Sequence, residues 1–175
     1  MSDLVVTADS GATSGRLMVG DAVFPCALGR AGLIRATEKR EGDGGTPLGI
    51  WPLRRLFYRP DRLPTPETGL VSVPLTPQHG WCDAPADPAY NRLVTLPYPA
   101  SHEEMWRQDA VYDLVVELGY NDDPVQPGSG SAIFLHIARD GYLPTEGCVA
   151  LAEADLLAVL RLCGPESRMI IRRAD

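Results

Sequence analysis

One histidine and one cysteine stand in surroundings that favour catalysis. His136 lies within the apolar run of residues 131–138, and Cys148 follows twelve positions later. A polar ring in an apolar strand must be hydrogen-bonded or lie at the edge of a cleft. A free thiol with a pKa of about 8.5 is mostly protonated at neutral pH, and a neighbouring imidazole takes that proton to form a nucleophilic ion pair. The spacing therefore predicts Cys148 as a nucleophile and His136 as its base.

Gly147 directly precedes the cysteine and leaves room for a bulky acyl group. The backbone N–H groups around Gly147 and Cys148 are candidate oxyanion donors, because such donors stabilise the charge that develops during acyl transfer. The competing interpretation is a hydrogen-bonded core histidine near a small buried cysteine.

Two short segments carry a family resemblance. Thr46-Pro47-Leu48-Gly49-Ile50 is similar to a T-P-x-G segment, and His136 followed by Thr145-Glu146-Gly147-Cys148-Val149 is similar to a His…[ST]-His-Gly-Cys signature. In order and separation these motifs resemble the YkuD-type L,D-transpeptidases, in particular the branch of lone catalytic domains. The resemblance spans roughly residues 25–172.

The resemblance implies a β-sandwich-like fold and acyl transfer on peptidoglycan stem peptides. In that chemistry the cysteine attacks the acyl carbon, releases the terminal D-Ala and passes the acyl group to an amine. The family uses no metal or organic cofactor and is acylated by carbapenems. Carried over, Cys148 would be the nucleophile, His136 the base and Gly147 an oxyanion donor. Tyr112, Arg139 and Thr145 are the candidate substrate-binding residues.

Two positions depart from the family pattern. Glu146 stands where a second histidine is usual, and Ala150 stands where an Arg or Asn is usual. In an extended segment both would share the face of Cys148. An ionised carboxylate about 6 Å from the sulfur would oppose the thiolate by roughly 3 kcal/mol at an effective dielectric of about 20. We therefore hypothesise that Glu146 instead orients protonated His136, as the third member of a triad, with Arg139 as an alternative partner that would neutralise it.

Three functions remain open at this point. The first is an L,D-transpeptidase, and the second is an L,D-carboxypeptidase or another cysteine peptidase that gives the same thioacyl group to water. The third is a non-catalytic module that binds wall peptides. The expected partners are stem peptides or muropeptides, with a monomer as the expected state.

The sequence predicts mainly β-strands as the elements that position these residues. Residues 4–35 predict a meander of short strands, with a tight hairpin at Gly20-Asp21. Residues 110–118 and 131–138 predict strands, the second buried on both faces. Residues 153–162 have helical spacing and end at Gly164-Pro165, and residues 169–172 predict a closing strand.

Two segments predict irregular structure. Residues 41–49 hold four glycines and a proline, which indicates a loop. Residues 59–100 are rich in proline, which indicates a long irregular segment of the kind that covers binding sites. The fold expected is a single L,D-transpeptidase-like catalytic domain over residues 1–175, a β-sandwich with one or two short helices and a long Pro-rich loop.

Composition narrows the classes of partner. The 175 residues include 16 Lys and Arg against 23 Asp and Glu, a formal net charge of −7, which disfavours nucleic acid. No apolar run is long enough for a membrane span and no signal peptide is seen. The sequence as it stands therefore predicts a cytoplasmic protein, or one of the cell envelope if a leader was removed. The four cysteines form no C-x-x-C pair, so no metal site is predicted, while disulfides stay open.

Overall fold

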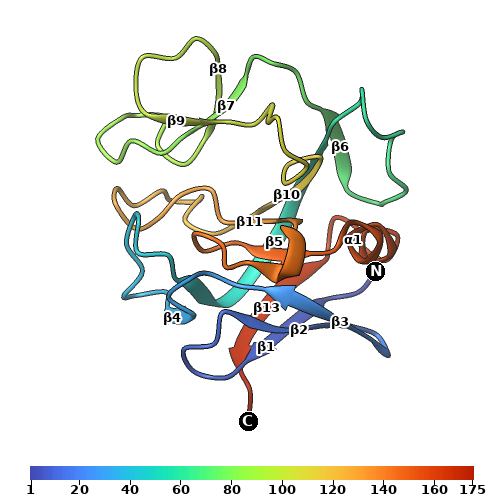
Figure 1. Cartoon of the computed structure of the whole chain (residues 1–175). Coiled ribbons are helices and arrows are strands. Elements are labelled where there is room, and N and C mark those ends of the chain that lie inside the picture. The colour runs from blue at the N-terminus through green and yellow to red at the C-terminus, as the bar shows by residue number, and fades with distance from the viewer.

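The computed structural model describes residues 1–175 and consists mainly of strands (Figure 1). They are β1 (Leu4–Ala8), β2 (Ser14–Val19), β3 (Ala22–Ala27), β4 (Leu33–Arg35), β5 (Thr46–Tyr58), β6 (Val71–Pro74), β7 (His79–Cys82), β8 (Leu93–Thr95), β9 (His102–Glu104), β10 (Leu114–Leu118), β11 (Phe134–Ile137), β12 (Val149–Leu151) and β13 (Arg168–Arg173). The only α-helix is α1 (Glu153–Leu160), and a short 3₁₀ turn spans Asp140–Tyr142.

The large sheet closes on itself. Its strands follow the order β10-β11-β12-β3-β2-β1-β13-β5-β4, and β10 pairs in addition with β5. Eight strands therefore form a ring, with β4 and β6 attached to β5. The mainly β prediction is confirmed. The predicted two-layer sandwich is not confirmed, because the long strand β5 contacts both β13 and β10 and joins the two ends of the sheet.

Alternating side chains divide the strands between two apolar clusters. Along β10, Leu114 and Val116 enter the large cluster of 27 buried residues, whereas Val115 enters a second cluster of ten. On β11, Leu135 enters the large cluster and Phe134 enters the second cluster. This period-two pattern is the one expected of strands with both faces covered.

A small sheet of order β8-β7-β9 covers β10 and β11 on the side of the second cluster (Figure 1). The Trp81 ring on β7 meets the Phe134 ring on β11 edge-on, with ring centroids 5.0 Å apart. The buried Met105 lies in the same cluster. The prediction that residues 59–100 are irregular is therefore only partly right, because β6, β7 and β8 form within that segment.

Several element boundaries differ from the sequence predictions. The hairpin at Gly20-Asp21 and the C-terminal strand form as expected, and the helix ends two residues early, at Leu160. The strand expected at 110–118 begins only at Leu114, and that expected at 131–138 spans 134–137.

The loop predicted for residues 41–49 ends at residue 45, because β5 begins at Thr46. Proline is tolerated near the start of a strand, so Pro47 does not prevent pairing with β4. Gly49 has a φ of +148° and lies under the Trp51 ring, where an added Cβ would come within 2.4 Å of that ring.

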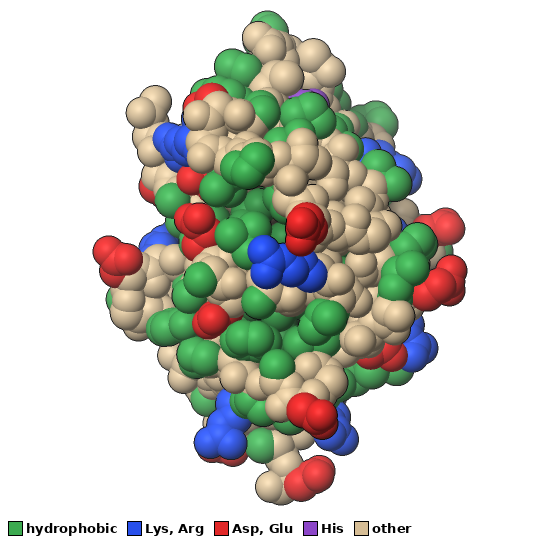
Figure 2. All heavy atoms as spheres, turned by 90° about the vertical axis from the view of Figure 1, so that its right-hand side faces the viewer, with side chains coloured by type: hydrophobic (Ala, Val, Ile, Leu, Met, Phe, Trp, Pro, Cys, Tyr) green, Lys and Arg blue, Asp and Glu red, His purple; other side chains and the backbone are tan.

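All four cysteines are free and buried, so no disulfide forms. No helix of the structure is both long and apolar enough to span a membrane. On the face shown in Figure 2, basic and acidic side chains are scattered singly among apolar ones, without a continuous basic stripe.

Candidate active site

His136 and Cys148 lie on the same face of two neighbouring parallel strands. The register pairs His136 of β11 with Ala150 of β12, and Cys148 comes just before β12, beside Phe134. The Phe134 N–H donates to the Cys148 Sγ at 3.4 Å. His136 is 6% exposed and Cys148 is 7% exposed. Both line one cavity of about 280 Å³, at the edge of the second apolar cluster.

The thiol of Cys148 is neutral in this resting arrangement. Its Sγ donates to the carbonyl oxygen of Ala132 at 3.2 Å, and burial raises the pKa of the thiol to about 12. A carbonyl oxygen only accepts, so this hydrogen bond favours the protonated form. Burial disfavours both charges of the predicted ion pair, and the two side chains hydrogen-bond to main-chain carbonyls instead of to each other.

His136 is held as a neutral imidazole with one nitrogen left as an acceptor. Its Nδ1 lies 2.9 Å from the carbonyl oxygen of Ile137, so Nδ1 carries the proton and Nε2 is unprotonated. Burial is the main reason that the pKa of His136 falls to about 4. The Tyr112 ring meets the imidazole edge-on, with ring centroids 5.5 Å apart. The ring is thus fixed in the tautomer that a general base requires.

The Thr145 hydroxyl organises the loop before the cysteine. It donates to the carbonyl oxygen of Cys148 at 2.7 Å and accepts from the Gly147 N–H at 3.1 Å. This arrangement corrects two predictions. The Gly147 N–H is used inside the loop and does not serve as an oxyanion donor, and the Thr145 hydroxyl is not free to bind substrate. The Cys148 N–H makes no hydrogen bond within the protein, so it is the available donor.

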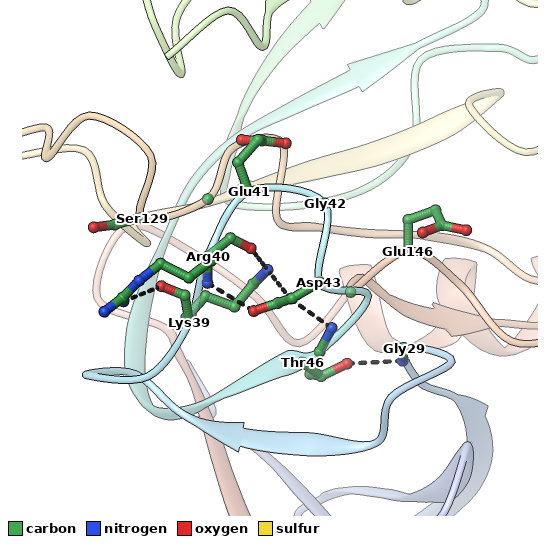
Figure 3. Close-up of polar contacts among 12 residues, drawn as sticks. Gly29, Lys39, Arg40, Glu41, Gly42, Asp43, Thr46, Ser129 and Glu146 are labelled. Carbon is green, nitrogen blue, oxygen red and sulfur yellow. Dashed lines mark hydrogen bonds and ion pairs between the residues drawn. The ribbon is translucent and has the colours of Figure 1, made fainter.

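Glycines from three segments converge behind Cys148. A Cβ on Gly29 would lie 2.1 Å from the Gly44 oxygen, and one on Gly147 would lie 2.8 Å from the Gly45 oxygen. The Thr46 hydroxyl accepts from the Gly29 N–H at 2.8 Å (Figure 3). Only residues without a side chain permit such close backbone packing. The Thr46-Pro47-Leu48-Gly49 segment therefore has a structural role at the back of the site.

A buried ion pair supports the same wall, and no sequence pattern had indicated it. Lys39 is 2% exposed, and its Nζ donates to Asp43 at 2.6 Å and to the Arg40 carbonyl at 3.0 Å (Figure 3). Asp43 also accepts from the Gly45 N–H at 2.8 Å. These hydrogen bonds lower the pKa of Asp43 against the effect of burial. The pair thus fixes the loop that packs on Gly147.

Glu146 faces Arg30 instead of the histidine. Its carboxylate accepts from the Arg30 Nε at 2.9 Å, and both side chains are more than half exposed. Figure 3 places Glu146 on the other side of the 39–46 loop from Glu41. The hypothesis that Glu146 orients His136 is wrong for this arrangement, because the Ile137 carbonyl already binds the Nδ1 of His136. Arg30, and not Arg139, is the partner that neutralises Glu146.

Polar and charged side chains line much of the remaining cavity wall, together with Val111, Leu143 and Pro144. The Tyr112 hydroxyl donates to Glu103 at 2.8 Å, and burial raises the pKa of Glu103. Arg107 also lines the cavity and pairs with Asp109 at 2.7 Å. Arg139 is an exposed cation of the cavity wall without a hydrogen-bond partner in the protein. Glu103 and Arg107 were missed in the sequence because both lie outside any apolar strand pattern.

Three comparisons with known proteins bear on this site. The family model described as YkuD, L,D-transpeptidase catalytic domain, matches residues 12–171. A search of curated proteins found no match. Among solved structures, the chain is similar to the helical cell shape determining protein Pgp2 (K307A mutant) from Campylobacter jejuni, at 17% identity and a TM-score of 0.48. That alignment covers 99% of this chain and 48% of Pgp2, so the chain spans about half the length of that protein.

Proposed function

Because the chain belongs to the YkuD family of L,D-transpeptidase catalytic domains, we propose that it is a cysteine acyltransferase acting on peptidoglycan stem peptides. The observation that carries the proposal is the shared cavity. Cys148, directly before β12, and an imidazole nitrogen of His136 that is left as an acceptor line the same cavity, which supports activation of the thiol by the imidazole.

In the acylation step the Cys148 Sγ attacks the carbonyl carbon of the scissile peptide bond. The thiol proton passes to the Nε2 of His136 as the S–C bond forms, because a resting thiolate is disfavoured by burial. The carbonyl oxygen becomes an oxyanion and accepts from the free N–H of Cys148. The C–N bond then breaks, and His136 returns the proton to the departing amine of D-Ala.

In the second step an acceptor amine attacks the thioester carbonyl. His136 takes a proton from that amine, the C–S bond breaks, and the Cys148 sulfur is released and reprotonated. The product is a new amide bond, with no net gain or loss of protons by the enzyme.

Arg139 binds a substrate carboxylate in this proposal. Its guanidinium is the cation of the cavity wall that no carboxylate of the protein engages, and guanidinium groups bind carboxylates in bidentate geometry. Tyr112 shapes the cavity through its ring and hydroxyl contacts. Substrate for this site occurs in the cell envelope or among released wall peptides.

The main alternative is an L,D-carboxypeptidase that gives the same thioacyl group to water. The two activities share the acylation step and differ only in the second step, in which the acceptor is water instead of the amine of a peptide. The carboxypeptidase therefore needs no binding site for an acceptor peptide. A wall-peptide binding module without catalysis is the third possibility, and it predicts no covalent adduct.

The test is intact-mass spectrometry of the full chain after exposure to a carbapenem. We expect one adduct on the wild type and none on Cys148→Ala, in which Cys26, Cys82 and Cys163 remain, because these three thiols lie outside the cavity that His136 lines. Absence of the adduct on a folded wild type would contradict the proposal. Incubation with muropeptides then separates transfer from hydrolysis, by a new cross-link against simple loss of D-Ala.

A further inference from the structure

Asn91 is a buried amide whose hydrogen-bonding capacity is fully used. It is 6% exposed, and its Oδ1 accepts from the Trp81 Nε1 and from the Ala132 N–H, each at 3.0 Å. Its Nδ2 donates to the carbonyl oxygens of Tyr120 at 3.0 Å and Asn121 at 2.8 Å. The side chain thus links the small sheet, through Trp81, to the segment that leads into β11.

The residue that Asn91 holds is the one that binds the nucleophile. The carbonyl of Ala132 accepts the thiol hydrogen bond of Cys148. Ala132 has a φ of +53°, a left-handed conformation that a residue with a Cβ adopts only where its surroundings impose it. The hydrogen bond from the Ala132 N–H to Asn91 is one of the contacts that hold Ala132 in this conformation.

The residues before Ala132 are anchored in the same way. The Gly130 N–H donates to the Tyr90 hydroxyl at 3.0 Å, and the Ser131 hydroxyl donates to Glu41 at 2.8 Å. Three successive residues are therefore fixed by side chains from outside their own segment. Of these contacts, only the one from Asn91 reaches the residue whose carbonyl oxygen touches the sulfur.

We propose that Asn91 is a positioning residue for the reaction, which holds Ala132 by its N–H so that the carbonyl on the other side of the Ala132 Cα fixes the Cys148 thiol in the cavity. The inference rests on the proposed function, since it takes Cys148 as the nucleophile. Asn91 touches neither substrate nor the reacting atoms, and it acts through Ala132.

A substitution at Asn91 removes no group that contacts the sulfur directly. The Phe134 N–H donates to Sγ, and the charged or titratable groups facing the sulfur are Glu103, Lys39, Glu146, Tyr112 and His136. A change in thiol behaviour after substitution of Asn91 therefore arises through the neighbours of Asn91, of which Ala132 is the one whose carbonyl binds the thiol.

The experiment compares Asn91→Ala with Asn121→Ala in the full chain. The two asparagines share a left-handed backbone, with φ of 56° and 49°, and Asn121 also makes three side-chain hydrogen bonds to its own loop, none of them to Ala132. Alkylation of Cys148 by iodoacetamide is followed against pH by peptide mass mapping.

In Asn91→Ala we expect the midpoint of alkylation to fall by about one pH unit, because the thiol loses the acceptor that favours its protonated form. We also expect the rate of acylation by a carbapenem to fall about tenfold, because the sulfur is no longer held in line for attack. Asn121→Ala should keep both wild-type values. An unchanged midpoint in folded Asn91→Ala, or an equal shift in Asn121→Ala, would overturn the proposal.

A measurement on the wild type covers the case in which Asn91→Ala fails to fold. The proposal requires the Ala132 amide to exchange its hydrogen at least 100-fold more slowly than an exposed loop amide, because its N–H is bound to buried Asn91. Fast exchange at Ala132 would refute it. Alkylation and hydrogen exchange do not depend on the natural substrate, so failure of the transpeptidase assignment is distinguishable from failure of this inference.

Discussion

Burial determines the resting state of the two reactive side chains. Cys148 and His136 were identified in the sequence because a polar ring interrupts an apolar run and a glycine precedes the cysteine. Their hydrogen-bond partners were not predictable, since the Ala132 and Ile137 carbonyls are main-chain groups that any residue would supply. The depth of burial, which sets both pKa values, depends on the small sheet that covers them.

The depressed pKa of His136 predicts the acid limb of the reaction. The proposed role of His136 as general base requires the neutral imidazole, and its folded-state pKa of about 4 lies well below the unfolded value of 6.5. Acylation of Cys148 should therefore not lose its base until the pH approaches 4. A fall centred near pH 6.5 in the rate of carbapenem acylation would contradict this assignment.

The same shift predicts a loss of stability in acid. The unfolded chain binds the proton more readily than the folded chain, so the free energy of unfolding falls as the pH drops from 6.5 to 4, by about 3 kcal/mol from this group. His136→Gln should lack that part of the decline. Urea unfolding of both proteins at pH 7 and pH 4.5 measures the difference, and parallel declines would show that His136 is not the cause.

Glu146 is predicted to matter little, although it stands at a position of the family signature. An ion pair exposed on both sides contributes about 0–1 kcal/mol, and its carboxylate does not contact His136. Glu146→Gln should keep turnover within about twofold and leave the pH profile unchanged. Arg30→Gln is the matched control, and a large loss in Glu146→Gln alone would restore a catalytic role for the carboxylate.

At the scale of elements, the loops behind the nucleophile are held by close backbone packing. The sequence indicated the loop by its glycines and located the hairpin and the helix well. It did not indicate that Gly29, Gly44 and Gly147 meet, because they are far apart along the chain and a glycine carries no side chain whose pattern predicts a partner. The Lys39–Asp43 pair was missed for a related reason, since charges in a polar loop ordinarily predict exposure.

Gly147→Ala should lose both stability and reactivity at Cys148. Its Cβ would meet the Gly45 oxygen at 2.8 Å, and a φ of +136° is unfavourable for any residue with a side chain. Gly128→Ala is the control, because its φ is +79° and its Cβ would meet nothing within 4 Å. We expect Gly128→Ala to cost about 1 kcal/mol and to acylate normally. Equal thermal shifts in the two variants would exclude the packing argument.

At the scale of the molecule, a closed sheet carries the reactive strands and a smaller sheet covers them. The β-rich composition of the chain was readable from Val-rich runs such as residues 114–118. The closed ring of strands could not be predicted from the sequence. Its closure depends on the pairing of β10 with β5, and nothing in either strand specifies a distant partner. The strands within the Pro-rich segment were not predicted either, because each has only three or four residues.

The small sheet is predicted to open independently of the ring. It has three short strands, and its apolar contacts lie in the smaller cluster, where Met105 is fully buried. Met105→Ala should cost about 2–5 kcal/mol and should speed amide hydrogen exchange in β7 and β9 more than in β1 and β13. Leu156→Ala, in the large cluster, is the comparison variant. Uniform acceleration in all strands of Met105→Ala would indicate one cooperative unit.

The position of β13 has a consequence during translation. This strand lies between β1 and β5, although it is synthesised long after both of them. Until residues 168–173 emerge, both neighbours present unpaired backbone groups along one edge, which are open to pairing with other chains. The nascent polypeptide therefore depends on its final strand to seal that gap, and a ribosome stalled shortly before that point would hold a chain prone to aggregate.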